Sequence, residues 1–316
     1  MRKLVALDSG TLDLPEEEWS PLREYGELVL HDATGTDPEL IRERCEGAAV
    51  VFTNKVPLRA EVLERLPELR LICVLATGTN NIDHEAAGRQ GIAVRNVPGY
   101  STASVVQHTL ALLLELTNRV GHYAGEVREG EWIRSRHFSF WHHEIPELAG
   151  RTAGIVGFGS IGRGVGAVLH SLGMRVLVHT RTPRDAPQWD GFAFCSDEEL
   201  FAKADVISLH CPLTEDNEGF VNAQLLRRCR PHCLLVNTAR GPLINEEDLL
   251  HALREGWIGG AALDVLGEEP MRKDHPLREA ANCLITPHQA WATTEARRRL
   301  MSITIESVDA FFREHP

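Results

Sequence analysis

A glycine-rich segment in the middle of the chain has the residue types and spacing of a phosphate-binding turn. Gly157-Phe-Gly159-Ser-Ile-Gly162 follows the apolar run Gly154-Ile-Val and opens a stretch with helical periodicity. Gly157 would permit the tight turn, Gly159 would let backbone N–H groups approach a pyrophosphate, and Gly162 would let the helix pack close to the strand. The N-terminus of that helix would add partial positive charge. We therefore expect a dinucleotide site, with a purely structural turn as the alternative, at Gly157, Gly159, Ser160, Ile161 and Gly162.

The end of the following strand bears on which dinucleotide would bind. Enzymes that use NAD place an Asp or Glu here, which hydrogen-bonds the ribose hydroxyls. The run from Arg175 instead ends in Thr180, followed by Arg181 and Arg184. No carboxylate would repel a 2′-phosphate at this position, and a guanidinium can bind one with two hydrogen bonds. The sequence favours NADP over NAD, with Thr180 and Arg181 as contacts, unless Arg181 is only a solvated loop charge.

Three segments downstream carry a resemblance to a known family. They are Val236-Asn-Thr-Ala-Arg240-Gly241, Asp264-Val-Leu-Gly-Glu-Glu269-Pro270 and Thr286-Pro-His288-Gln-Ala290. In this order, and with the glycine turn before them, they resemble the D-isomer-specific 2-hydroxyacid dehydrogenases over essentially the whole chain. The glycerate dehydrogenase and hydroxypyruvate (glyoxylate) reductase branch is the most similar, judging from Ala76 to Asp83, Phe140-Trp141, Glu147 to Gly150 and Ala290 to Thr293.

The resemblance implies a catalytic set of Arg240, Glu269 and His288 for the reduction of a 2-keto acid. His288 suits the proton step because an imidazole titrates near neutral pH. Glu269 would fix the ring tautomer and stabilise the imidazolium, and Arg240 would hold the carboxylate and the carbonyl oxygen of the substrate. Plainer alternatives are a strand-end cap for Arg240 and a buried interface side chain for His288. Glu268 could replace Glu269, although the family pattern puts the acid directly before the proline.

The resemblance also implies further binding residues. The glycine-containing turn after the strand at residues 71 to 76 would present N–H groups to the substrate carboxylate, unless it is an ordinary strand-to-helix turn. The expected substrate contacts are Thr77, Gly78, Thr79 and Trp291, with Arg240 and His288. The remaining expected cofactor contacts are His210, Cys211, Pro212, Thr238, Ala239 and Asp264, the last one at the nicotinamide amide.

Two series of short apolar runs predict an α/β fold with parallel sheets. The first series lies at Leu4–Leu7, Ala48–Thr53, Leu71–Ala76 and Ile92–Val97; the second lies at Ala153–Gly157, Arg175–Thr180, Asp205–His210, Cys233–Asn237, Gly260–Val265 and Cys283–Thr286. A helical stretch from Thr293 to Arg313 has room to return to the first series. With the resemblance, this predicts two doubly wound parallel-sheet domains: a Rossmann dinucleotide domain, residues 102–286, inserted into a flavodoxin-like substrate domain, residues 1–101 and 287–316. Substrate would bind in the cleft between them, at the carboxyl ends of the strands.

The helix expected from Ser101 to Arg119 is apolar on nearly all faces and must be covered on most of them. Residues 121–148 have no clean period and contain Trp132, Phe138, Phe140 and Trp141, whose apolar surface needs a partner. We expect a homodimer through these segments, or else a loop that folds onto its own domain.

Composition excludes several classes of partner and site. The 316 residues carry a net charge of -12, which would repel nucleic acid and an anionic membrane surface. Seven scattered cysteines, together with a start unlike a signal peptide, favour reduced thiols in the cytoplasm. Cys229, His232 and Cys233 could begin a metal site, but no second pair lies at ligand spacing, and we expect no metal.

Two other functions fit the same sequence. One is a dehydrogenase for a bulkier 2-keto acid. The other is a binding protein that senses dinucleotides on the same fold, since a fold alone does not settle function.

Overall fold

The computed structural model describes residues 1–315, which form two compact units. Unit 1 comprises residues 1–101 and 291–315 of the described chain, and unit 2 comprises residues 102–290. Four residues, 287–290, cluster with unit 2 and not with the second part of the substrate domain where we expected them. The reason is local, because the backbone N–H groups of His288, Gln289 and Ala290 all donate to Asp264.

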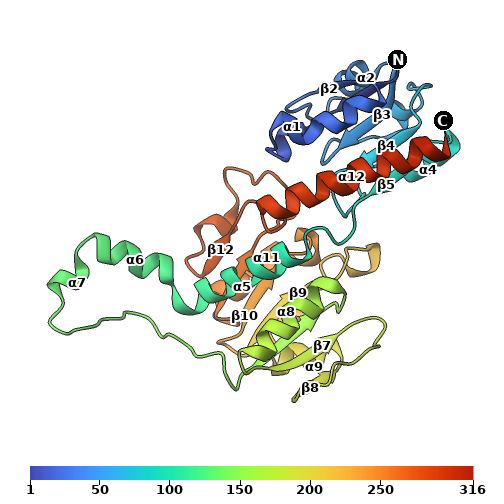
Figure 1. Ribbon diagram of the computed structural model, residues 1–316. Helices are drawn as coiled ribbons and strands as arrows, with labels where there is room; N and C mark the ends of the chain where they lie inside the picture. Colours follow the sequence, from blue (N-terminus) through green and yellow to red (C-terminus); the bar gives the residue numbers. More distant parts are fainter. Residues whose placement is uncertain (316) are drawn as a thin grey trace. The chain divides into compact units, whose positions relative to one another are not determined.

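Unit 1 is built on a five-stranded parallel sheet in the order β2-β1-β3-β4-β5. The strands are β1 Lys3–Ala6, β2 Glu27–Leu30, β3 Ala48–Thr53, β4 Leu71–Val74 and β5 Ala93–Asn96; the helices are α1 Glu16–Trp19, α2 Pro38–Cys45, α3 Ala60–Leu63, α4 His84–Arg89 and α12 Thr294–Glu314. Alternate residues of β3 enter two separate cores. Phe52 packs with Trp19 and Leu300 from α1 and α12, whereas Val51 packs with side chains of α2, α3 and α4. Both faces of the sheet are therefore covered (Figure 1).

Unit 2 is built on a seven-stranded parallel sheet in the order β12-β11-β10-β9-β6-β7-β8. The strands are β6 Thr152–Val156, β7 Arg175–His179, β8 Phe192–Phe194, β9 Val206–Leu209, β10 Leu234–Asn237, β11 Gly260–Leu263 and β12 Cys283–Ile285; the helices are α5 Thr102–Asn118, α6 Val120–Arg128, α7 Glu131–Arg134, α8 Ser160–Ser171, α9 Asp197–Lys203, α10 Ala223–Leu226 and α11 Glu246–Arg254. Side chains of α5 and α8 pack on one face of the sheet, and those of α9, α10 and α11 pack on the other. The expected parallel α/β architecture is thus confirmed in both units.

Helices α6 and α7 and the segment that follows them extend away from the sheet of unit 2 (Figure 1). The segment has internal order, because Trp132 Nε1 donates to the carbonyl oxygen of Phe138 and the Tyr123 hydroxyl accepts from the backbone of His142 and His143. We call residues 120–148 the arm. Among residues 1–315, no helix is both long and apolar enough to cross a bilayer.

Candidate active site

His288 and Glu269 form a close pair in unit 2. Glu269 Oε2 lies 2.7 Å from His288 Nδ1, and Glu269 Oε1 accepts from the backbone N–H of Leu266 at 3.1 Å. The Glu269 carboxylate is therefore held by its own loop and directed at the imidazole. Glu268 instead pairs with Arg272 at 3.2 Å, with both side chains more than half exposed. The structure thus brings Glu269 to His288, and Glu268 to the surface.

The loop of Arg240 packs directly against the loop that leads to Glu269. A Cβ added at Gly241 would lie 1.9 Å from the backbone carbonyl of Leu266, so only glycine permits this approach. Asn237 shapes the Arg240 loop, because its side chain accepts from Ala239 N and donates to Arg240 O. The Arg240 guanidinium donates to the carbonyl oxygen of Ala239 at 2.7 Å, which uses one of its five N–H donors.

A buried carboxylate orders the segment that carries His288. His288 has a φ of 51°, a left-handed conformation that costs a residue with a side chain free energy and must be held by its surroundings. Asp264, whose side chain is completely buried, accepts from Thr286 Oγ1 and from the backbone of Gln289 and Ala290. Burial by itself raises the pKa of Asp264, but hydrogen bonds from His108, Thr286 and this backbone outweigh burial and hold the pKa below its ordinary value. The Asp264 carboxylate is thus hydrogen-bonded within unit 2, and its expected contact with the nicotinamide amide stays a prediction.

The glycine turn has the geometry that a dinucleotide needs. Gly157 has a φ of 90°, and a Cβ there would lie 2.5 Å from the backbone nitrogen of Cys211. A Cβ at Gly162 would lie 2.1 Å from the carbonyl oxygen of Gly157, whereas the space beside Gly159 is open. Gly159 is also the N-cap of α8, which has no side-chain cap. The first N–H groups of α8 are therefore suited to bind phosphate.

Beside this turn lies a pocket of about 470 Å³, a volume typical of cofactor sites. Of the expected cofactor residues, those that line it are Gly157, Gly159, Thr180, Arg181, His210, Cys211 and Pro212. The expected residues that are not among its lining are Ser160, Ile161, Gly162, Thr238, Ala239 and Asp264. Lining residues that we had not assigned include Phe158, Arg163, His179, Thr182, Arg184 and Asn217.

Arg163 ties the arginine-containing loop after β7 to the glycine turn. Its guanidinium donates to the carbonyl oxygens of Arg184 and Asp185 and lies 4.5 Å from the centre of the Phe158 ring. The sequence offered one signal that Arg163 could line the cofactor pocket, because this residue lies in the first turn of α8, directly after the glycine turn. His210 also lines the pocket, and burial lowers its pKa to about 3, so its ring is neutral at physiological pH; its Nε2 lies 2.8 Å from Ser208 Oγ.

The other expected substrate residues belong to unit 1. Thr77, Gly78 and Thr79 follow β4 at its carboxyl end. Thr77 Oγ1 donates to the carbonyl oxygen of Val97, and Thr79 Oγ1 lies 2.8 Å from His84 Nε2. The Trp291 ring packs edge-on against Tyr100.

The residues that we weighed as metal ligands have other partners. His232 Nε2 lies 2.7 Å from Asp205 Oδ1, which also accepts from Arg230. Within residues 1–315, no three or more His, Cys, Asp or Glu side chains form a group that could hold a metal ion.

Comparisons with known proteins identify the family to which the chain belongs. Residues 110–290 match the NAD-binding domain of the D-isomer-specific 2-hydroxyacid dehydrogenases. A hydroxypyruvate reductase of Blautia hydrogenotrophica is 40% identical over 99% of this chain and 98% of its own length, and a glycerate dehydrogenase of Methylorubrum extorquens is 38% identical over 100% and 98%. An NADPH-dependent glyoxylate/hydroxypyruvate reductase of Sinorhizobium meliloti, solved with NADP and malonate, superimposes with a TM-score of 0.85 at 26% identity, over 98% of this chain and 93% of that one. The chain therefore belongs to the D-isomer-specific 2-hydroxyacid dehydrogenase family, in its glycerate dehydrogenase and hydroxypyruvate reductase branch.

Proposed function

We propose that this protein reduces a small 2-keto acid, hydroxypyruvate or glyoxylate, to the D-2-hydroxy acid with NADPH. The observation that carries the proposal is the pairing of His288 Nδ1 with Glu269 at 2.7 Å, in the same unit as the glycine turn. The names of the 38–40% identical relatives support the substrate class.

We assign the proton step to His288. An ionised Glu269 can only accept hydrogen bonds, so Nδ1 carries a hydrogen and Nε2 is the nitrogen that exchanges a proton with the substrate oxygen. A nicotinamide cofactor, when bound, would supply the hydride. Glu269 stabilises the imidazolium from which the proton leaves, and its second bond, to Leu266 N, fixes the direction of the pair.

Arg240 is assigned to the substrate carboxylate and carbonyl oxygen. A guanidinium donates two parallel hydrogen bonds to a carboxylate, which orients the keto acid, and its charge stabilises the negative charge that develops on the carbonyl oxygen. We propose that Thr77, Gly78, Thr79 and Trp291 add substrate contacts, as the family resemblance implies.

The preference for NADPH rests on the loop after β7. Thr180, Arg181 and Arg184 line the pocket. Thr180 follows the strand where NAD enzymes place a carboxylate, and the arginines after it can bind a 2′-phosphate. The Sinorhizobium meliloti enzyme, described as NADPH-dependent, supports this preference.

Steady-state kinetics with NADPH and NADH tests the proposal. We expect consumption of NADPH, followed at 340 nm, with hydroxypyruvate and glyoxylate, and little with phenylpyruvate. His288→Gln should abolish most turnover and leave NADPH binding unchanged, because the pocket beside the glycine turn does not include His288. Cofactor binding without turnover of any keto acid would favour the dinucleotide-sensing alternative. A preference for phenylpyruvate would indicate a dehydrogenase for bulkier substrates.

We also propose a homodimer formed through the arm. Of the ten exposed large apolar side chains in the described chain, seven lie in it: Val120, Val127, Trp132, Ile133, Phe138, Trp141 and Ile145. Apolar surface of this extent is typical of a protein interface.

A cytoplasmic location is proposed from the cysteines. All seven have free thiols, as in proteins of reducing compartments. Fractionation of cells that make the protein tests this location.

A further inference from the structure

Helix α5 contacts both ends of the segment that carries His288, residues 286–290. Ser104 Oγ donates to the carbonyl oxygen of Ala290 at 2.6 Å. His108 lies one turn further along α5, and its Nε2 is 3.0 Å from Thr286 Oγ1 and 3.3 Å from Asp264 Oδ1. Residues 286–290 are therefore held at each end by side chains four positions apart on one helix, which face the same side.

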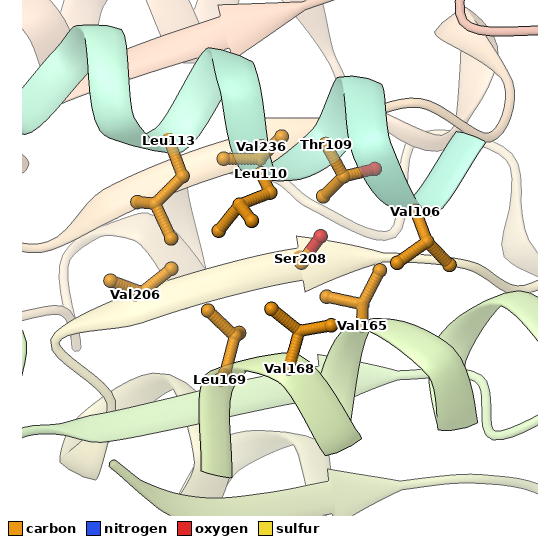
Figure 2. Close-up of a pocket in the computed structure, with 10 residues that line it drawn as sticks. All are labelled: Val106, Thr109, Leu110, Leu113, Val165, Val168, Leu169, Val206, Ser208 and Val236. Carbon is orange, nitrogen blue, oxygen red and sulfur yellow. The ribbon is translucent and has the colours of Figure 1, made fainter. Parts of the chain in front are cut away.

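The next residue of α5 reaches the segment that carries Arg240. Thr109 Oγ1 lies 2.9 Å from Thr238 Oγ1, two residues before Arg240. The Thr109 hydroxyl donates its own proton to the carbonyl oxygen of Val105 at 2.8 Å, so Thr238 is the donor between the two threonines. Figure 2 shows the Thr109 side chain directed from α5 towards the sheet. One helix thus contacts both segments that carry the proposed catalytic residues.

The available hydrogens determine what His108 does. Thr286 has one hydroxyl proton and donates it to Asp264 Oδ1 at 2.6 Å. The contact between His108 Nε2 and Thr286 Oγ1 is then a hydrogen bond only if Nε2 carries the hydrogen. Asp264 Oδ1, also within reach of this nitrogen, likewise requires a donor. His108 is therefore the N–H donor that completes the contacts of Asp264.

We propose that His108 is a positioning residue for the reaction: as an N–H donor on α5 it holds Thr286 and Asp264, and through them it sets the direction of the His288 ring. The inference rests on the proposed function, in which His288 exchanges the proton. It makes helix α5 part of the structure that positions His288 for this proton exchange.

Paired variants test the donor role. His108→Phe keeps a flat ring without a donor, and His108→Gln keeps a donor N–H. Since small displacements of a reacting group cost large factors in rate, we expect kcat with hydroxypyruvate to fall about tenfold to a hundredfold in H108F. The Kd for NADPH, measured by fluorescence, should stay within about twofold, and H108Q should recover most of kcat. The matched control is His251→Phe, which removes an exposed imidazole from α11 of the same unit. Equal kcat values for H108F and H251F would overturn the proposal.

A readout independent of turnover separates this inference from the proposed function. In protein with ¹³C-labelled histidine, the Cε1–H resonance of His288, assigned by its loss in H288Q, should shift or broaden in H108F and stay in place in H251F. Thr286→Val removes the hydroxyl between His108 and Asp264 and should act like H108F, whereas Thr286→Ser keeps this hydroxyl and should not. These two variants replace H108F in the test if H108F does not fold. An unmoved resonance overturns the positioning role. A moved resonance in a protein that reduces no keto acid supports positioning and refutes the proposed function.

Discussion

At the scale of single residues, the proposed chemistry depends on the carboxylate 2.7 Å from His288 Nδ1. Keto-acid reduction needs a proton from the imidazolium of His288, which the negative charge of Glu269 stabilises. Glu269→Gln keeps the shape of the side chain and removes its charge. We therefore expect kcat with hydroxypyruvate to fall about tenfold to a hundredfold in E269Q, and to stay near the wild-type value in the control Glu268→Gln. Equal kcat values for E269Q and the wild type would show that the pairing does not control the proton step.

The proposed preference for NADPH also depends on a few side chains. If Arg181 binds the 2′-phosphate, Arg181→Ala removes a charge-assisted hydrogen bond that only NADPH can make, so KM for NADPH should rise about tenfold and KM for NADH should barely change. Thr180→Asp should reverse or erase the preference, because a carboxylate repels the 2′-phosphate and accepts from the ribose hydroxyls of NAD. Equal use of both cofactors by the wild-type enzyme would contradict this account.

His210 offers a prediction about acid stability. Burial lowers its pKa from 6.5 to about 3. Between pH 6.5 and pH 3, His210 therefore binds a proton in the unfolded chain but not in the folded chain. Stability is then lost as pH falls below 6.5, by about 2 kcal/mol at pH 5. His210→Gln should lose about that much less free energy of unfolding between pH 7 and pH 5, measured with urea, than the wild type. The same loss in both proteins would mean that His210 titrates normally when folded.

At the scale of elements, α5, α8 and β9 enclose a small cavity of about 10 Å³ (Figure 2). Its lining includes Val165, Leu169 and Val206, with Ser208 and Thr109 as the polar members. The volume is close to that of one water molecule, so an added methylene has room. Val165→Ile should change the free energy of unfolding by less than about 1 kcal/mol, whereas Leu169→Ala should cost about 2–5 kcal/mol. If V165I destabilises the protein as much as L169A, the packing is tighter than described.

The elements also show what the sequence could predict. Runs such as Ala48–Thr53 and Leu234–Asn237 are central strands, buried on both faces, and their apolar character identified them. Strands β2 and β8 have only four and three residues, so each gives too short an apolar run to identify a strand, and we did not predict them. Helices α6 and α7 were missed because the arm exposes many of its apolar side chains, which removes the usual helical period.

The candidate site, like the fold, could be predicted only in part. Arg240, Glu269 and His288 lie in short motifs that resemble a family, so their identity was available from the sequence. His108 lies 178 positions from Thr286, and nothing in either segment points to the other. Only the fold, which places α5 against the ends of β11 and β12, reveals such a contact. The hydrogen bonds of Asp264 to the segment that carries His288 could not be predicted from the sequence for the same reason.

At the scale of the whole molecule, the arm forms the interface of the proposed homodimer. Phe138 and Ile133 are each 90% exposed, and a polar replacement at such a position has no cost within the chain but a large one in an apolar interface. We expect the wild type to have twice the chain's mass of 35.1 kDa by light scattering, and the double variant Ile133→Glu/Phe138→Asp to have the single mass. Leu172→Glu, at an exposed apolar residue outside the arm, is the control and should remain a dimer. The thermal midpoint of the dilute double variant should stay near that of the control, because the arm contributes little to the core of unit 2. A wild-type protein at the single mass would refute the dimer, and a double variant that keeps twice the mass would place its interface outside these two side chains.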